Sequence, residues 1–176
     1  MANLATTFYR ISDKAVGQSL MRMVQKGVTQ AVDILSELNY EVTPLMSLRC
    51  EVVQATYNGR HYEIVTSSAW TECTDFRHAL EDIFGVPIQF ISSEEGNMYY
   101  ATNIEEYRDA YQVQCGCVDK VVFDEMVKDE TELLKTLSYL CGKEVVSLET
   151  ADKAISDYNS NANDDYLYYT KYTYTD

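Results

Sequence analysis

The chain has 176 residues and carries 14 Lys/Arg against 28 Asp/Glu, which gives a formal net charge of −14 at pH 7. Its length fits a single domain, and a hydrophobic share of 46% is enough for a sizeable core, which argues against wholesale disorder. No apolar run reaches the roughly 18 residues of a membrane span, and the first residues lack the basic and apolar segments of a secretory signal. With five cysteines and no such signal, we expect reduced thiols and a cytoplasmic location.

The negative charge is unevenly distributed along the chain. Residues 1–50 hold five Lys/Arg against four Asp/Glu, residues 51–100 hold two against eight, and residues 101–176 hold seven against sixteen. Nucleic acids are polyanions that proteins bind through Lys and Arg. The C-terminal two thirds should therefore repel nucleic acid and attract a basic protein surface.

The first strong pattern along the chain is helical. Asp13 can cap a helix, and apolar residues recur every three or four positions from Val16 to Leu38. This predicts one long N-terminal helix of about seven turns, weakened by Gly27 and barred from continuing by Pro44.

A β-hairpin should follow the helix. Residues 48–57 and 60–68 are rich in β-branched and aromatic side chains and flank Asn58-Gly59. Asn-Gly is the strongest short-range hairpin signal because the turn needs positive φ angles.

The remaining elements alternate between helices and strands. In chain order, the patterns predict a helix over 75–84 between Thr74 and Gly85, strands over 86–91 and 98–101, a short helix from Asn103 to Gln112, a strand over 114–123 broken or bulged at 115–117, a helix from Asp129 to Gly142, a short strand over 145–148 and a helix from Thr150.

This order indicates the α+β class, with antiparallel hairpins interleaved with helices in a single compact domain over residues 1–158. Residues 159–165 have the composition of a polar linker, and residues 166–176 are rich in tyrosine. The C-terminal segment 159–176 is thus expected to end either in an edge strand or in a tail that docks on a partner; plain disorder is a third reading.

No catalytic motif occurs in the chain. It lacks a phosphate-binding glycine loop, a dinucleotide fingerprint, a His-Glu-x-x-His zinc motif and a Gly-x-Ser-x-Gly elbow. We therefore expect no enzyme, no cofactor and no metal. Two weaker alternatives stay open: a Cys73 nucleophile with His61 as its base, and a zinc site drawn from Cys73, Cys115, Cys117, Cys141, His61 and His78.

Clustered carboxylates are the most informative side chains. The candidate partner-binding residues are Glu81, Asp82, Glu94, Glu95, Glu105, Glu106, Asp109, Asp124, Glu125 and Asp129, together with Tyr166, Tyr168, Tyr172 and Tyr174. Carboxylates can occupy a basic groove in place of phosphates, and tyrosines commonly anchor interfaces. An ordinary solvated surface is the plain alternative.

In composition alone, a short, acidic, tyrosine-rich chain without motifs resembles the accessory proteins of bacteriophages and mobile elements. We therefore expect a non-catalytic, anti-defence inhibitor that mimics nucleic acid. It would occupy the basic surface of a restriction, CRISPR or polymerase component in the host cytoplasm, without binding nucleic acid or membrane itself.

One alternative is a virion or assembly subunit that oligomerises through the long helix and the C-terminal strand. A third is a small cysteine-dependent or metal enzyme.

Overall fold

The computed structural model describes residues 3–117, 120–161 and 165–175. Helices and antiparallel strand pairs alternate along the chain, which confirms the α+β class. The chain forms two compact units, residues 1–104 (unit 1) and residues 105–176 (unit 2), each with its own hydrophobic core. In the part of the chain that is described, no helix is both long and apolar enough to cross a membrane.

Unit 1 is built on an antiparallel sheet with the strand order β2-β3-β1-β4-β5. These strands are β1 (Leu4–Ile11), β2 (Cys50–Tyr57), β3 (Tyr62–Ala69), β4 (Gln89–Glu94) and β5 (Tyr99–Thr102), and a 3-10 turn, η1 (Glu95–Asn97), joins the last two. Both β3 and β4 pair with β1, so the earliest strand in the sequence forms the centre of this sheet.

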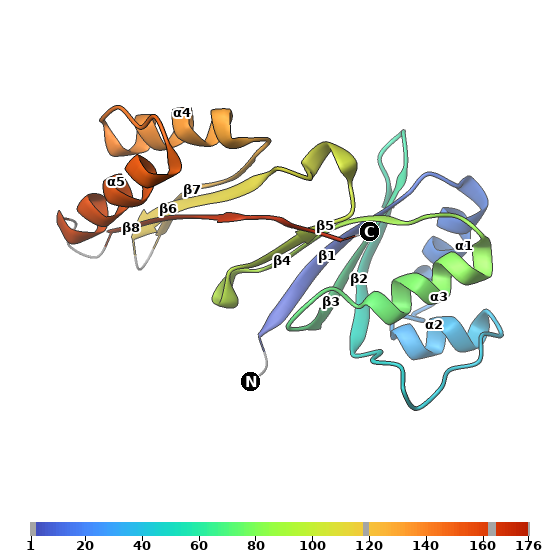
Figure 1. The fold of residues 1–176 in the computed structure, drawn as a ribbon. Coiled ribbons are helices and arrows are strands. Elements are labelled where there is room, and N and C mark those ends of the chain that lie inside the picture. The colour runs from blue at the N-terminus through green and yellow to red at the C-terminus, as the bar shows by residue number, and fades with distance from the viewer. Residues whose placement is uncertain (1–2, 118–119, 162–164, 176) are drawn as a thin grey trace. The chain divides into compact units, whose positions relative to one another are not determined.

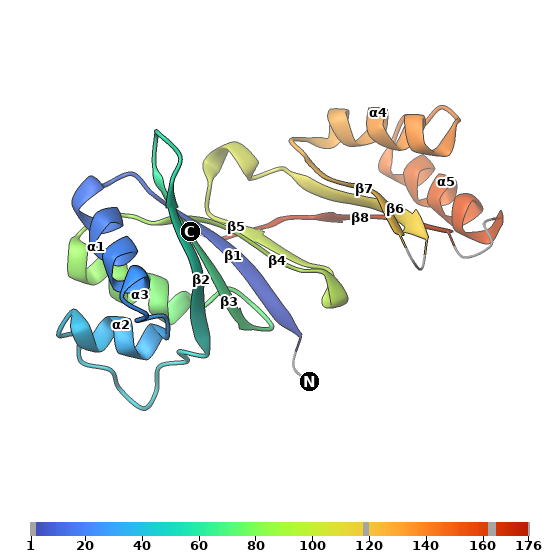
Figure 2. The same ribbon diagram turned by 180° about the vertical axis from the view of Figure 1, so that it is seen from behind.

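Three helices cover one face of this sheet: α1 (Lys14–Gln25), α2 (Ala31–Glu37) and α3 (Thr74–Phe84) (Figures 1 and 2). The core between the helices and the sheet contains Tyr9, Phe76 and Phe90, all almost fully buried. The ring of Tyr9 lies edge-on to that of Phe76 at 6.4 Å between centroids. At about 25 cal/mol per Å² of apolar surface, such burial is the main stabilising contribution to the unit.

The prediction of a long N-terminal helix is wrong in two respects. The chain begins with the strand β1, and the helical pattern after it is divided into α1 and α2. The division occurs because Gly27 has a φ of +85°, which a right-handed helix does not accommodate, and because Gln30 forms a β-bridge with Glu51. The cap at Asp13 is confirmed, since its carboxylate accepts a hydrogen bond from the Val16 N–H at 2.9 Å.

The predicted hairpin and the helix that follows it are confirmed. The side chain of Asn58 accepts hydrogen bonds from the N–H groups of Arg60 and His61, and Gly59 has a φ of +93°. Helix α3 ends at Gly85, whose φ of +66° is typical of a glycine stop signal.

Unit 2 contains a three-stranded antiparallel sheet with the order β7-β6-β8. Its elements are η2 (Glu105–Tyr107), β6 (Tyr111–Cys117), β7 (Lys120–Val127), α4 (Glu130–Cys141), α5 (Leu148–Asn161), β8 (Asp165–Lys171) and the short β9 (Thr173–Tyr174). Helices α4 and α5 cover one face of the sheet, where Val113, Leu133 and Leu167 form a fully buried core (Figure 1).

Several predictions in this unit need correction. The strand predicted over 114–123 is a hairpin of β6 and β7; residues 118–119 lie outside the described residues. Its predicted bulge is confirmed as a register shift between Cys115 and Gly116. The strand predicted over 145–148 is wrong, because buried Val145 belongs to the connection into α5. Residues 159–161 of the predicted linker end α5, and residues 162–164 lie outside the described residues.

Candidate functional site

The predicted carboxylates are divided between the two units, and those of unit 1 have mainly local roles. Glu81 binds Arg77 at 3.2 Å and accepts a hydrogen bond from the Ile88 N–H. Glu94 is buried and accepts hydrogen bonds from two N–H groups of η1, both at 2.8 Å. Asp82 and Glu95 are exposed. We therefore leave Glu81 and Glu94 out of any partner-binding surface.

The register of the unit 2 sheet brings most of the other predicted carboxylates to one end. Tyr111 is paired with Val127 on one side and with Lys171 on the other. The segments just before β6, just after β7 and at the end of β8 must therefore meet. We name the carboxylates that gather there the acidic end: Glu105, Glu106, Asp109, Asp129, Glu130 and Glu132.

Three cations are bound within the acidic end. Arg108 pairs with Glu105 at 2.7 Å, Lys171 with Asp109 at 2.9 Å and Lys128 with Glu106 at 3.5 Å. The hydrogen bonds of Arg108, followed by that of Tyr174, lower the pKa of Glu105, and Asp109 raises the pKa of Lys171. Both groups are therefore charged at neutral pH, and the six carboxylates exceed the three cations.

Two carboxylates of the acidic end, Glu130 and Glu132, are not among the candidate partner-binding residues of the sequence analysis, although they follow the cap residue Asp129 in the first turn of α4. Glu132 accepts a hydrogen bond from the Lys128 N–H at 2.8 Å, while Asp129 caps α4 by accepting one from the Glu132 N–H at 2.9 Å. Negative groups in the first turn of a helix are favoured by its dipole. The capping signal at Asp129 was the feature that could have located them.

The predicted tyrosines have different environments. On the face of the unit 2 sheet opposite α4 and α5, Tyr166 and Tyr168 are partly exposed and stack at 5.9 Å between centroids. Tyr172 is buried and donates to Gln112 at 3.0 Å; burial, with a smaller contribution from Asp124, raises its pKa to about 12. Tyr174 donates to Glu105 at 2.9 Å.

The two β7 carboxylates lie on opposite faces of the sheet. Asp124 pairs in register with Gln114, on the same face as Tyr168, and accepts a hydrogen bond from Gln112. Glu125 is exposed at the edge, on the face that α4 and α5 cover. We name the first of these surfaces the tyrosine face; its accessible residues are Asp124, Tyr166 and Tyr168, and the side chains of Gln112 and Gln114 on the same side of the sheet are buried.

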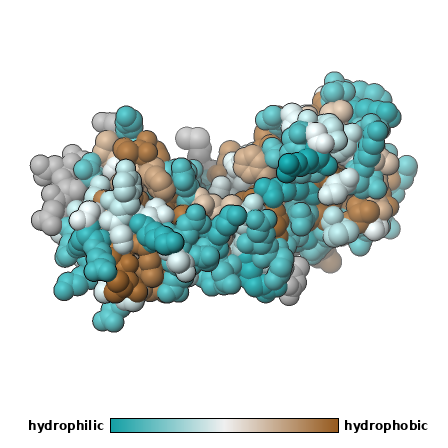
Figure 3. Space-filling view, turned by 90° about the horizontal axis from the view of Figure 1, so that it is seen from above, coloured by the Kyte–Doolittle hydropathy of each residue, from teal (hydrophilic) through white to brown (hydrophobic). Residues whose placement is uncertain are grey.

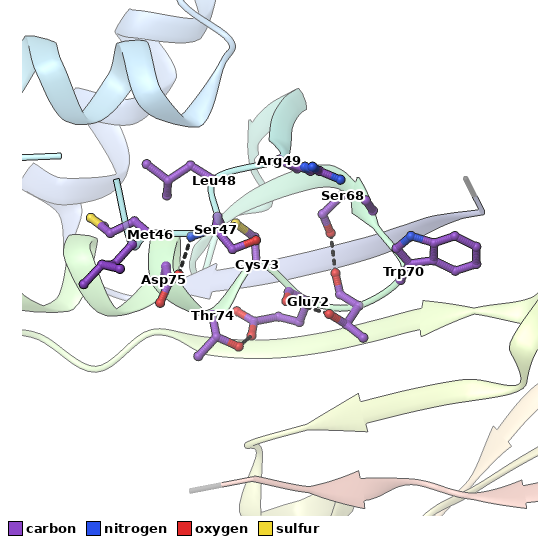
Figure 4. A pocket seen from close by; sticks show the side chains of 13 residues that line it. Met46, Ser47, Leu48, Arg49, Ser68, Trp70, Glu72, Cys73, Thr74 and Asp75 are labelled. Atoms are coloured by element: carbon purple, nitrogen blue, oxygen red, sulfur yellow. Dashed lines mark hydrogen bonds between the residues drawn. The ribbon is translucent and has the colours of Figure 1, made fainter. Parts of the chain in front are cut away.

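Unit 1 contains a pocket of about 530 Å³ between residues 45–49 and 68–75. Figure 4 shows Trp70 at one end of it and Cys73 beside Ser47 in the middle. Trp70 has a φ of +71°, rare for a non-glycine residue, and its side chain is about half exposed. Strained backbone of this kind is often found beside ligand sites.

A buried ionic network lies next to the pocket and was not anticipated from the sequence. Glu72 accepts hydrogen bonds from Tyr9 at 2.8 Å, from Thr74 at 2.6 Å and from Arg77 at 3.2 Å. The Arg77 guanidinium also lies 5.0 Å from the centre of the Phe90 ring. Because both Glu72 oxygens are bound by protein donors and Arg77 is held between Glu72 and Glu81, the network is an internal brace for α3 rather than a binding site.

The two weaker chemical alternatives can be compared with this geometry. His61 lies in the β2–β3 turn, where its Nε2 is 2.9 Å from the Asn58 amide. Of the proposed zinc ligands, Cys73, His61 and His78 belong to unit 1, and Cys115, Cys117 and Cys141 belong to unit 2. Within the described ranges, no group of three or more His, Cys, Asp or Glu side chains could hold a metal ion.

Comparisons with family models, with curated proteins and with solved structures give no match for this chain.

Proposed function

We propose that this chain is a non-catalytic acidic binding protein that occupies a basic surface of a host protein which normally holds nucleic acid. The observation that carries the proposal is the acidic end of unit 2, where the sheet register gathers six carboxylates around three cations. Electrostatic attraction to a basic groove would speed association and exclude other polyanions from that groove.

The ion pairs at the acidic end are suited to exchange with a partner. The side chains of Lys128 and Glu106 are 65% and 63% exposed, and those of Lys171 and Asp109 are 51% and 68% exposed. Pairs exposed to this extent contribute little net stability because water competes for both charges. Arg or Lys from a partner could therefore replace the internal cations at little cost.

Unit 2 already contains an internal example of the contact we propose. The Arg108 guanidinium lies 3.8 Å from the centre of the Tyr174 ring and binds Glu105, which also accepts a hydrogen bond from Tyr174. A ring and a carboxylate thus bind one arginine together. Tyr166 and Tyr168, whose partly exposed rings stack on β8, would offer the same kind of ring contact to an arginine of the partner.

The face of the molecule drawn in Figure 3 has no large continuous apolar area, which supports recognition of a partner by charge. Hydrophilic side chains form most of the face in Figure 3, and hydrophobic ones show between them in small groups. Interfaces of this type depend on a few anchors within a polar rim.

The test compares two variants that neutralise equal numbers of carboxylates. Partners captured from host lysate at low salt are purified, and their association with the full chain is measured over a salt series. Glu106→Gln/Asp109→Asn/Glu130→Gln should slow association by roughly tenfold at low salt, whereas Asp33→Asn/Glu37→Gln/Glu41→Gln in unit 1 should not. A captured partner should also release duplex DNA when the chain binds.

Two outcomes would overturn this proposal. One is an affinity that stays constant from low to moderate salt, since exposed charges are screened over that range. The other is an equal loss in both triple variants, which would show that only net charge matters.

An assembly subunit is the second candidate, and one observation favours it. Strand β7 is at the edge of the unit 2 sheet and exposes Val121 and Val122 by 50% and 68%. An exposed apolar edge strand can pair with another copy. Light scattering distinguishes the two functions, because a monomer at micromolar concentration supports the binding protein and a closed oligomer supports the subunit.

A further inference from the structure

Trp70, the only tryptophan of the chain, lies in a strained turn at one end of the unit 1 pocket. The Thr71 N–H donates a hydrogen bond to the Ala69 carbonyl at 2.9 Å, which closes a three-residue γ-turn around Trp70. With its φ of +71°, this is the rare and strained form of that turn. Glycine or asparagine adopts a positive φ at lower cost, so the backbone alone does not explain a tryptophan here.

Hydrogen bonds from other parts of unit 1 hold this turn in place. The Trp70 N–H donates to the Asn3 carbonyl at 3.1 Å, and the Ala69 N–H donates to the Arg49 carbonyl at 3.3 Å. Strained residues persist only where their surroundings fix them, and they cluster at ligand sites. The effect of the strain here is to place an indole ring at the pocket while 48% of its surface remains exposed.

The same strand pairing brings a cation to the Trp70 end of the pocket. Strand β2 begins at Cys50 and β3 ends at Ala69, so Arg49 lies across the strand pair from the residue that precedes Trp70. In Figure 4 the Arg49 side chain lies above Ser68, toward the end of the pocket where Trp70 is found. Arg49 is exposed, and among the described residues no carboxylate forms an ion pair with it.

The two carboxylates that line the pocket, in contrast, are bound within the protein. Glu72 is 6% exposed and forms the buried ion pair with Arg77. The Asp75 carboxylate accepts the Ser47 N–H at 2.6 Å, at the end of the pocket opposite Trp70 (Figure 4). Of the charged groups that line the pocket in the described part of the chain, Arg49 is therefore the one that an anion from solution can neutralise.

The pocket has the size and the side chains of a small-molecule site. Its volume of about 530 Å³ is within the range of roughly 300–1,000 Å³ that is typical of such sites. The indole of Trp70 offers a face on which another ring can stack. The Arg49 guanidinium can bind a carboxylate or a phosphate through two parallel hydrogen bonds. Leu45, Met46 and Leu48 add apolar contacts.

We propose that this pocket is a small-molecule site for a planar aromatic ring that carries a carboxylate or a phosphate, with the ring against Trp70 and the anionic group on Arg49. Nucleoside monophosphates and aromatic carboxylates share this chemistry. All residues of the site belong to unit 1, so the proposal is independent of the acidic end of unit 2.

The experiment uses the fluorescence of the full chain, which comes from Trp70 as its only tryptophan. The chain is titrated with adenosine monophosphate and with benzoate, and then with their neutral counterparts adenosine and benzamide. We expect saturable quenching by at least one anion, and the responding anion identifies the source of the ligand. Its neutral counterpart should bind roughly tenfold more weakly, because the charge-assisted hydrogen bonds to Arg49 are lost.

Two variants and one control assign the binding to named side chains. Arg49→Met should lower the affinity for the anion to that of its neutral counterpart, whereas Arg60→Met, in the β2–β3 turn of the same unit, should bind like the wild type. Trp70→Asn, which accommodates the positive φ, should abolish the binding heat in calorimetry. Circular dichroism establishes that each variant is folded.

The wild-type titrations decide the matter even if a substitution disturbs folding. The absence of saturable quenching by both anions, or equal affinity for an anion and its neutral counterpart, would overturn the proposal. So would an equal loss of affinity in folded Arg49→Met and Arg60→Met, which would show that only the net charge of unit 1 matters.

Discussion

Unit 1 and unit 2 contain the same number of Lys/Arg residues, seven each, but differ in their acids. Residues 1–104 contain 12 Asp/Glu and residues 105–176 contain 16, so the net charges are −5 and −9. The shorter unit therefore carries most of the negative charge.

The two units also place their ion pairs differently. In unit 1 the Arg77 and Glu72 side chains are 5% and 3% exposed and form part of the core beside α3. In unit 2 every ion pair in the described residues joins side chains that are at least 42% exposed. Burial makes an ionic contact structural, because neither charge can return to water alone. Exposure leaves the contact exchangeable, which is the property a docking surface needs.

The largest loss of folding stability should come from breaking the buried ion pair between Arg77 and Glu72. Arg77→Met leaves the Glu72 carboxylate buried, with the hydroxyls of Tyr9 and Thr74 as its main partners. Removing one member of such a pair costs about 3–5 kcal/mol. Urea denaturation should show the loss as a lower midpoint.

The double variant Arg77→Met/Glu72→Gln should recover part of that loss, because no unpaired charge is then left in the core. If Arg77→Met unfolds at the wild-type urea midpoint, the buried pair of unit 1 is no more important for stability than the exposed pairs of unit 2, which would contradict the comparison between the units.

A smaller loss of folding stability should follow from a substitution at Gly17, where α1 packs closely against β3 in unit 1. Gly17 lies in α1, and a Cβ added there would overlap the ring of Tyr62 in β3. Overpacking by the added methyl group should therefore cost about 1–3 kcal/mol of stability. Alanine gains roughly 1 kcal/mol over glycine in a helix. We expect the overpacking cost to exceed this gain, so that Gly17→Ala is less stable than the wild type.

Thermal unfolding followed by circular dichroism would measure the Gly17 effect. Gly17→Ala/Tyr62→Leu provides the control, since the shorter side chain removes the overlap. A more stable Gly17→Ala variant would mean that α1 does not lie against β3 as described.

Local signals with a physical mechanism were readable from the sequence. Asp13 and Asp129 cap helices, and Gly85 and Gly142 end them with positive φ. Each depends only on residues within one turn, so one sequence suffices to find it.

Features that depend on distant partners were not readable. Strand β1 was missed because its buried position 7 is a threonine, whose hydroxyl lies 2.7 Å from that of Ser92, 85 residues away. Glu94 was counted as surface although it is buried. The acidic end was only partly anticipated, because the pairing of Tyr111 with both Val127 and Lys171 is needed to assemble it.

The smallest loss of folding stability should come from removing one member of an exposed ion pair in unit 2. Lys128→Met removes the partner of Glu106, a contact of 3.5 Å between side chains more than 60% exposed. Such pairs contribute about 0–1 kcal/mol and are screened by salt. Urea midpoints of the variant and the wild type should therefore nearly coincide, and any difference should vanish in concentrated NaCl. A loss as large as that of Arg77→Met would mean that these pairs brace unit 2, and its carboxylates would then not be available to a basic partner.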